Sequence, residues 1–281
     1  MHFTTIPAGQ ERKGTPAGSA HGSDISDPTA GKSTTNAAQR TKRIVSANQR
    51  RAEIVIAALF LVTAAASIPG AFVLDHLLNV SDYLARVYPQ KDVIAWGSLL
   101  WSINNIGIVF IAVFVFGLLR KLDATLAAGY LACRIIEGTI MMLGVAATFL
   151  LIPLSQQYLQ AGAPQGSWFL SMGAILKQAR FLGLSGLSLP ILGLGGLLFS
   201  WMLLRFRLVG RAICVVGLIG YAVVLCGSIA GWFGLIDVAP GSNGTIFALP
   251  VATFEIILLP LWLLFKGFKL PETPAHIAAT K

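Results

Sequence analysis

An arginine and a glutamate, Arg134 and Glu137, lie three residues apart inside a long apolar run of the chain. This spacing places both side chains on one face of a helix, within reach of an ion pair. A charge near the bilayer centre costs about 2.5 to 3.5 kcal/mol on insertion scales, so such residues face a protein interior and mark an organising or functional site. We therefore expect a polar site inside the membrane.

More polar residues fall at the same depth when about 1.5 Å per residue is counted from the ends of the apolar runs. They are Glu255 in the last run and Asn104 and Asn105 in the second. Two glutamates and one arginine in one layer require that a carboxyl group be protonated or share a proton, and we expect Glu255 to be that group. The interior face of the third run is predicted by a stripe at helical spacing: Tyr130, Arg134, Glu137, Met141, Gly144 and Thr148.

Two cations near the start of the fourth run, Lys177 and Arg180, are secondary candidates for the same site. They could reach Glu255 only if that run tilts toward the centre of the protein.

The sequence lacks the motifs of metal binding, hydrolysis and dinucleotide binding. All four histidines lie outside the apolar runs, and the three cysteines form no CxxC pair, so we expect no metal site. No GxSxG or HExxH motif occurs, and the glycines near Gly195 lack the third glycine of a dinucleotide-binding loop. The sequence therefore predicts no catalytic residues and no cofactor, and a protein that is not an enzyme.

Composition places the chain in a lipid bilayer, because 55% of its 281 residues are hydrophobic and only 12% are charged. Its net charge of +9 does not indicate nucleic-acid binding, since most of the basic residues lie in an N-terminal segment and at the ends of apolar runs. That distribution is the one that keeps flanking loops on the cytoplasmic side.

Three regions follow from the pattern along the chain. Residues 1–50 are polar, basic and without hydrophobic periodicity, and we expect a disordered cytoplasmic tail. Its basic end is interpreted as a topology anchor, with binding of anionic headgroups as the alternative. Residues 51–270 should form the membrane bundle, and residues 271–281 a short C-terminal tail.

Six apolar runs are long enough to cross about 30 Å of hydrocarbon as helices. They are Ile54–Leu74, Val93–Leu119, Thr125–Pro153, Phe181–Leu204, Arg211–Gly231 and Ile246–Phe265. The predicted fold is therefore an all-α polytopic membrane protein with six transmembrane helices. The basic loops after the second and fourth runs belong on the same side as both termini, which we expect in the cytoplasm.

The fourth run is too long for one upright span, since 168–204 would extend about 55 Å as a single helix. We favour an interfacial helix over Trp168–Arg180 that leads into the span, with one long tilted helix as the alternative. The glycine-rich faces of the fourth and fifth runs suit close helix contact and would permit a homo-oligomer.

Four sequence segments together resemble a bacterial membrane family called domain of unknown function 4386. They read GYLACRIIEGTIMMLG, QQYLQAGAP, LLRFRLVGR and LPVATFEIILLPLWLLFKGF. The resemblance covers about residues 50–270. It implies a multi-pass protein of the bacterial cytoplasmic membrane and singles out Arg134, Glu137, Glu255 and the closing Lys266 to Phe268. It implies no particular chemistry, because the family has no assigned function.

Several functions stay open from the sequence. The buried polar layer could fix helix register by hydrogen bonds, or it could bind a small solute or a proton, as in a small transporter or permease. Alternatively, the chain could be a membrane-embedded sensor or partner subunit that signals through its tail.

Overall fold

The structure, a computed structural model, describes the backbone of residues 28–236 and 243–270 and the side chains of 46–236 and 246–270. All regular elements in these ranges are helical. They contain six helical segments long and apolar enough to cross a membrane, in agreement with the predicted fold. These are Ser46–Leu78, Lys91–Leu119, Ala124–Gln160, Trp168–Arg205, Arg211–Trp232 and Ile246–Phe265.

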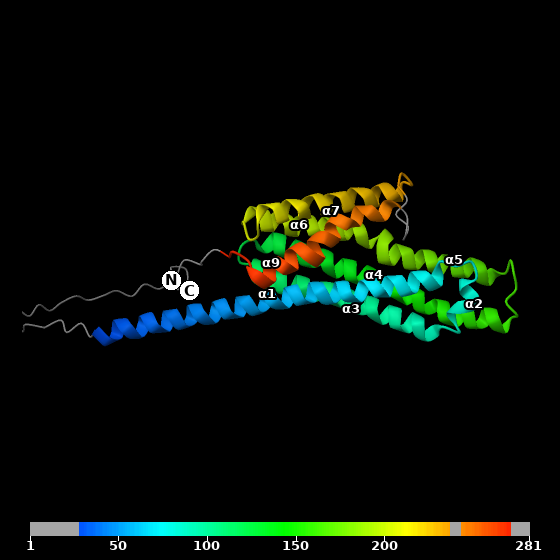
Figure 1. Ribbon diagram of the computed structural model, residues 1–281, viewed down its shortest axis with the longest axis horizontal. Coiled ribbons are helices and arrows are strands. Elements are labelled where there is room, and N and C mark those ends of the chain that lie inside the picture. The colour runs from blue at the N-terminus through cyan, green and yellow to red at the C-terminus, as the bar shows by residue number, and fades with distance from the viewer. Residues whose placement is uncertain (1–27, 237–242, 271–281) are drawn as a thin grey trace, which may run out of the picture. The chain divides into compact units, whose positions relative to one another are not determined.

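The first three spans belong to single α-helices, and a short helix joins the first two (Figure 1). The elements are α1 (Pro28–Leu78), α2 (Tyr83–Val87), α3 (Lys91–Leu119) and α4 (Ala124–Gln160).

The fourth and sixth spans are interrupted by π-helical turns, whereas the fifth is one α-helix. The fourth consists of α5 (Trp168–Phe181), η1 (Leu182–Gly186) and α6 (Ser188–Arg205), and the fifth is α7 (Arg211–Trp232). The sixth consists of η2 (Asn243–Ala248), α8 (Leu249–Ala252), η3 (Thr253–Leu258) and α9 (Leu259–Phe265).

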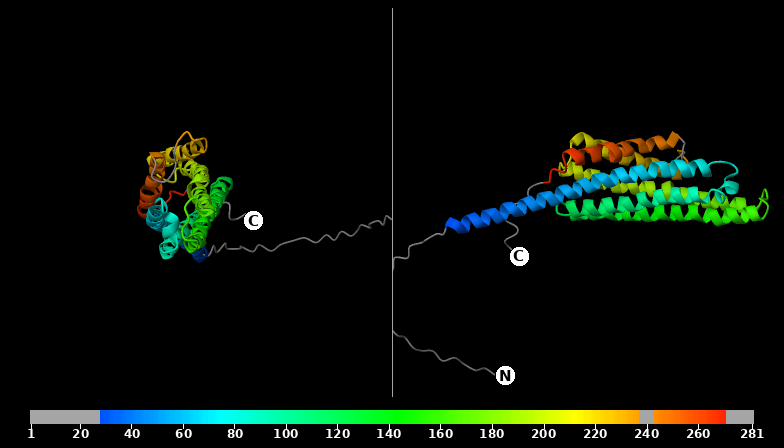
Figure 2. Two further views of the ribbon diagram at one scale, coloured as in Figure 1. Left: turned by 90° about the vertical axis from the view of Figure 1, so that its right-hand side faces the viewer. Right: turned by 60° about the horizontal axis from the view of Figure 1, so that its bottom comes forward.

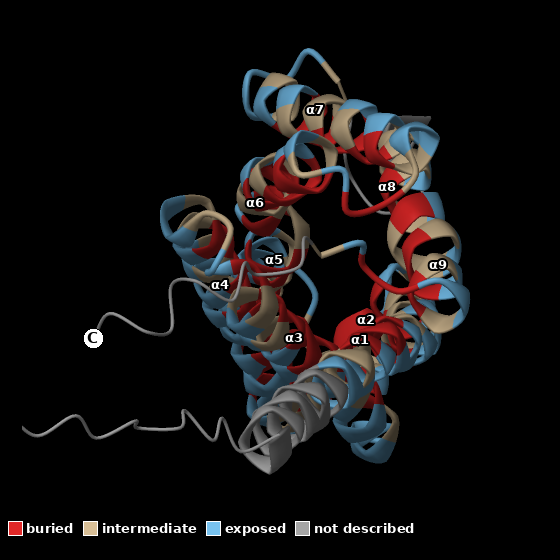
Figure 3. Cartoon of the chain, turned by 90° about the vertical axis from the view of Figure 1, so that its left-hand side faces the viewer, coloured by how far each residue is buried: buried red, intermediate tan, exposed pale blue. Residues whose placement is uncertain are grey.

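The spans run side by side, and α4 lies among α3, α5, η1 and α6 (Figures 1 and 2). The buried parts of the helices lie on their inward sides, while the exposed parts lie on the outside of the bundle (Figure 3). Many of those exposed residues are large and apolar, including Phe110, Leu143 and Ile219. Apolar side chains on the outside and polar ones within are the arrangement that a bilayer requires.

Glycines allow the closest helix contacts, as expected where lipid removes the hydrophobic drive for helix association. A Cβ atom added to Gly183 would lie 2.6 Å from Gly144 Cα, so η1 and α4 touch backbone to backbone. In the same way Gly196 of α6 lies directly under the ring of Tyr221 of α7.

Two boundaries differ from the sequence prediction. Helix α1 begins at Pro28, inside the segment expected to be disordered through residue 50, and it continues to Leu78, beyond the expected end at Leu74. Asp75 therefore belongs to a helix and not to a loop. The predictions for residues 1–27 and 271–281 lie outside the described residues.

The fourth span also differs from the favoured interpretation. Its three parts, α5, η1 and α6, all pack along α4, so they form one bent helical element instead of a helix lying across the end of a span. The bend falls at the π-helical turn before Pro190, and π-helical turns and prolines are common causes of helix kinks.

One end of the bundle gathers the basic loops. An ion pair of 3.3 Å joins Arg205 Nη1 to Asp123 Oδ2, and the Lys269 N–H donates to the Leu208 carbonyl at 3.0 Å. The α3–α4 loop, the α6–α7 loop and the residues after α9 therefore meet at this basic end. The α1–α3 and α4–α5 connections lie at the opposite end. Assignment of the basic end to the cytoplasm stays a prediction.

Candidate intramembrane polar site

Arg134 of α4 pairs with two carboxylates in the interior. Its Nη1 lies 3.2 Å from Glu137 Oε2, one turn further along α4, and its Nη2 pairs with Oε1 of Glu255 in the last span. The Arg134 side chain is only 2% exposed, and that of Glu137 is 5% exposed. The predicted stripe of α4 is buried throughout, so the sequence identified the correct face of this helix.

Glu255 lies on the π-helical turn η3, between Pro250 and Pro260. Pro260 has no N–H to donate to the carbonyl of Ile256, so the α-helical hydrogen-bond ladder breaks at this position. A π-helical turn is a rare local solution that is frequent at functional sites. Of the two carboxylates, Glu255 is the more open, with a side chain 20% exposed.

Tyr221 of α7 is a third partner. Its hydroxyl donates to Glu255 Oε1 at 2.6 Å, so this oxygen is bonded by both Arg134 and Tyr221. The ring of Tyr221 is held by its neighbours, because Gly196 of α6 leaves room for it and Phe254 packs edge-on against it.

Tyr130, one turn before Arg134 on α4, packs against the Arg134 guanidinium. The Arg134 guanidinium carbon lies 5.5 Å from the centre of the Tyr130 ring, which stacks on Phe199 at 4.8 Å. A guanidinium over an aromatic face is held by the cation–π attraction, which strengthens when water is excluded. We refer to Arg134, Glu137, Glu255, Tyr221 and Tyr130 as the Arg134 cluster.

Some polar atoms of this region have no hydrogen-bond partner within the described part of the chain. They are Arg134 Nε, the Tyr130 hydroxyl and the nearby Ser200 Oγ, and all are buried. Buried polar groups are normally hydrogen-bonded, so these atoms are exceptions within this interior.

The charge of the Arg134 cluster does not balance if both glutamates are ionised, since one cation then faces two anions. An excess charge in a low-dielectric interior is costly, and a proton on one carboxyl removes it. Glu137 lies on the same helix as Arg134 and is the more deeply buried. Glu255 is bonded through one oxygen only among the described residues, and its side chain is partly exposed.

Asn104 and Asn105 are both buried but lie outside the Arg134 cluster. Asn104 Nδ2 donates to Asn105 Oδ1 at 3.3 Å, and Asn105 Nδ2 contacts Met142 Sδ at 3.5 Å. No hydrogen bond joins either residue to Arg134 or the two glutamates within the described ranges. The predicted layer of five therefore divides into the Arg134 cluster and a separate asparagine pair between α3 and α4.

Lys177 and Arg180 do not reach Glu255. Arg180 Nη2 instead pairs with Asp75 Oδ1 of α1 at 2.8 Å, and Lys177 Nζ lies 4.6 Å from the centre of the Tyr83 ring. The sequence did not indicate Asp75 as the partner, because it placed this residue in a loop.

Among residues 46–236 and 246–270, no three histidine, cysteine, aspartate or glutamate side chains group as metal ligands would. In the Arg134 cluster the guanidinium already occupies the side of Glu255 Oε1 that a cation would take.

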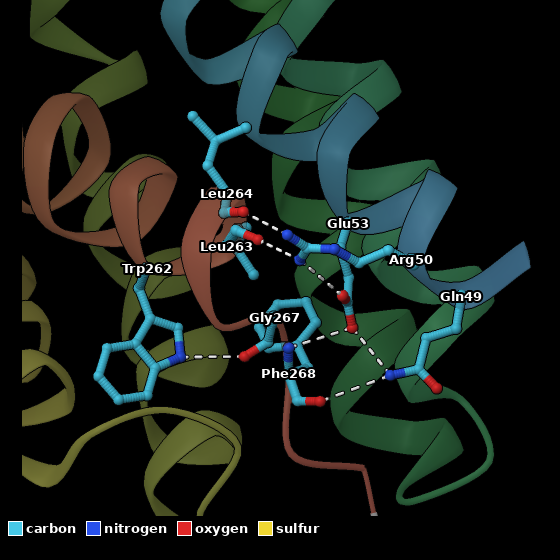
Figure 4. Close-up of polar contacts among 8 residues, drawn as sticks. All are labelled: Gln49, Arg50, Glu53, Trp262, Leu263, Leu264, Gly267 and Phe268. Carbon is cyan, nitrogen blue, oxygen red and sulfur yellow. Dashed lines mark hydrogen bonds and ion pairs between the residues drawn. The ribbon is translucent and has the colours of Figure 1, made fainter. Parts of the chain in front are cut away.

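A second polar group fastens the first span to the last at the basic end (Figure 4). Arg50 Nη1 donates to the Leu263 carbonyl at 2.5 Å, and its Nη2 donates to the Leu264 carbonyl, which caps α9. The buried carboxylate of Glu53 accepts the Phe268 N–H at 3.0 Å and the Gln49 side-chain amide at 2.8 Å. We call Gln49, Arg50 and Glu53 with these backbone partners the terminal clasp.

The fold and the buried ionic cluster define a multi-pass α-helical membrane protein. A family model described as "Domain of unknown function (DUF4386)" matches residues 55–267, and the chain belongs to this family. The match confirms the resemblance found in the sequence. No curated protein and no solved structure matches the chain.

Proposed function

We propose that this membrane protein binds and exchanges a proton at Glu255. The observation that supports the proposal is the environment of this carboxyl group. Its Oε1 pairs with Arg134 and Tyr221, its side chain is partly exposed, and it lies on a π-helical turn within a span. Ionisable groups inside spans commonly belong to proton relays or solute pathways.

The other members of the Arg134 cluster have supporting roles in this proposal. Arg134 and Glu137 form the fixed ion pair of α4, so the charge of the cluster varies only with the proton on Glu255. Tyr221 orients Glu255 by its hydrogen bond. Tyr130, whose ring lies against the Arg134 guanidinium, holds that side chain in place.

The interrupted helices also favour proton or solute binding over a purely structural role. Transporters often build midplane sites from discontinuous spans, and here both the fourth and the sixth spans contain π-helical turns. In this proposal the protein is a binding or transport protein of the bacterial cytoplasmic membrane with both termini inside, it is not an enzyme, and its partner is the lipid bilayer.

A structural role is the second candidate, and a specific observation favours it. The Arg134 cluster ties α4, α7 and the last span together, since Glu255 contacts both Arg134 and Tyr221. If register were its only role, Glu255 would keep one protonation state throughout the pH range in which the protein stays folded.

The experiment that separates the two roles is infrared difference spectroscopy on the full chain in lipid bilayers as pH is changed. Proton binding predicts a carbonyl-stretching band of a protonated carboxyl that grows as pH falls and is absent in Glu255→Gln. The control is Asp92→Asn, which alters an exposed carboxylate at the start of α3 and should leave the band in place. A wild-type spectrum without any Glu255-dependent band contradicts the proposal.

A further inference from the structure

Another charged group lies toward the end of the bundle opposite the basic end, on the side of α5 that faces α1 and α2. Lys177 and Arg180 are one helical turn apart on α5, so their side chains share a face. Arg180 pairs with Asp75 at 2.8 Å, and the Lys177 ammonium lies over the Tyr83 ring. We call Lys177, Arg180, Asp75 and Tyr83 the α5 cationic cluster.

This cluster carries more positive than negative charge. Asp75 is paired with Arg180, and Lys177 has no carboxylate within ion-pair distance among the described residues. Tyr83 provides no counter-charge, because burial raises the pKa of its hydroxyl and keeps the ring neutral. Two cations therefore share one anion, which is the opposite imbalance to that of the Arg134 cluster.

Hydrogen-bond donors without an acceptor lie in the same region as the excess positive charge. Arg180 is only 8% exposed, and its Nε has no hydrogen-bond partner in the described part of the chain. A further buried donor on α3, Trp101 Nε1, is equally without a partner there. Trp101 packs on the apolar group that contains Leu184, one turn beyond Arg180. A buried guanidinium N–H of this kind normally has an acceptor, so the surroundings of Arg180 are deficient in acceptors.

We propose that Lys177 and Arg180 bind a small monocarboxylate anion. A single negative charge balances the cluster, whereas a phosphate dianion would exceed the balance. A carboxylate has two acceptor oxygens and can take a charge-assisted hydrogen bond from each of two cationic donors. Lys177 is half-buried and the Asp75 side chain is 27% exposed, so a small anion can approach from the opposite end.

The site is separate from Glu255. Arg180 packs at the level of Gly144 of α4, two turns beyond Glu137, which corresponds to about 10 Å along the helix. Anion binding at α5 and proton binding at Glu255 can therefore be tested independently.

The test is a titration of the full chain in lipid nanodiscs with sodium acetate at fixed pH, with sodium chloride keeping the ionic strength constant. Tryptophan fluorescence and the thermal unfolding midpoint are the readouts. We expect a saturable response to acetate. In Lys177→Met the half-saturating acetate concentration should rise about tenfold or more, because one charge-assisted hydrogen bond is lost.

Matched variants keep the test decisive. Lys121→Met removes an exposed lysine at the basic end and should bind acetate as the wild type does. Replacing Arg180 by Gln together with Asp75→Asn removes the ion pair without leaving a lone buried charge, and it should abolish the response. Glu255→Gln should retain acetate binding, which separates this proposal from the proton site.

Three results would overturn the proposal. They are the absence of a saturable acetate response in the wild type, an unchanged half-saturation in Lys177→Met, and binding of inorganic phosphate as tight as that of acetate.

Discussion

Oε1 of Glu255 accepts a hydrogen bond from the Tyr221 hydroxyl at 2.6 Å, and the same oxygen forms an ion pair with Arg134. One carboxylate oxygen thus joins a tyrosine of α7, an arginine of α4 and the π-helical turn of the last span. The Arg134 cluster therefore has two kinds of member: an internal ion pair on α4, and a carboxyl group held by a single oxygen.

Replacing the arginine should damage the protein far more than replacing Glu255. Arg134→Ala leaves the carboxylates of Glu137 and Glu255 without their shared cation, and removal of one partner of a buried ion pair costs about 3 to 5 kcal/mol. Glu255→Gln keeps an acceptor oxygen for Arg134 and Tyr221 and leaves Arg134 with Glu137 as a neutral pair. Yield of monodisperse protein and the thermal midpoint in detergent are the measurements.

A triple variant provides the control for that comparison. Glu137→Gln and Glu255→Gln added to Arg134→Ala remove the repelling charges and should recover part of the lost stability. Equal loss of folded protein in Arg134→Ala and Glu255→Gln would refute the division of roles.

Removing the tyrosine hydroxyl should have a modest effect on stability. Tyr221→Phe keeps the ring over Gly196 and loses one hydrogen bond, which is worth about 1.5 to 3 kcal/mol when the acceptor is charged. Thermal unfolding of Tyr221→Phe and of Tyr221→Phe with Glu255→Gln should show that the two losses are not additive. Full additivity would mean that the hydroxyl stabilises the protein through another contact.

The backbone contact between α4 and η1 makes Gly183 intolerant of a side chain. A Cβ there would lie 2.6 Å from Gly144 Cα, so Gly183→Ala must displace one helix, and overpacking of this kind costs about 1 to 3 kcal/mol. The control is Gly117→Ala on α3, where nothing lies within 4 Å of the added atom and where alanine should be neutral or stabilising. The difference between the thermal midpoints of the two variants is the measurement, and equal midpoints would contradict the close contact.

The terminal clasp should depend on Arg50 and not on its neighbour. Arg50→Met removes the donors to the carbonyls of Leu263 and Leu264 and should free the residues after α9. A single cysteine placed at Phe268, which is 5% exposed, should then react faster with a polar maleimide. Arg51→Met removes an exposed arginine and should leave the rate unchanged. A slow rate in Arg50→Met would show that the clasp holds without this side chain.

The sequence was sufficient to predict the number of spans and the buried face of α4. Apolar length predicts the six spans because a bilayer penalises every polar residue at depth. The i, i+3 spacing of Arg134 and Glu137 fixes their pairing within α4, and periodicity fixes which side of α4 is buried.

The partners across helices could not be predicted. Counting residues gives the depth of Asn104 and Asn105 but not their direction around α3. In the structure Asn105 contacts Met142 and Asn104 donates to Asn105, and neither bonds to Arg134 within the described ranges. The sequence did not indicate Tyr221 as a site residue, because a tyrosine in a span is not unusual. Only the crossing of α6 and α7 brings it to Glu255. The partner of Arg180 is Asp75, which lies in the last turns of α1. The hydropathy pattern predicted that this helix ends at Leu74, so it placed Asp75 in a loop.

Carbodiimide labelling tests the central claim most directly. A hydrophobic carbodiimide reacts with a protonated carboxyl group in an apolar environment, and mass spectrometry of the digested protein identifies the modified residue. Exchange at Glu255 predicts that Glu255 is labelled in native membranes, that labelling decreases as pH rises, and that Glu137 stays unmodified. Labelling of Glu137 instead, or no modification of Glu255 at any pH at which the protein is folded, would contradict the assignment of Glu255 as the exchangeable carboxyl.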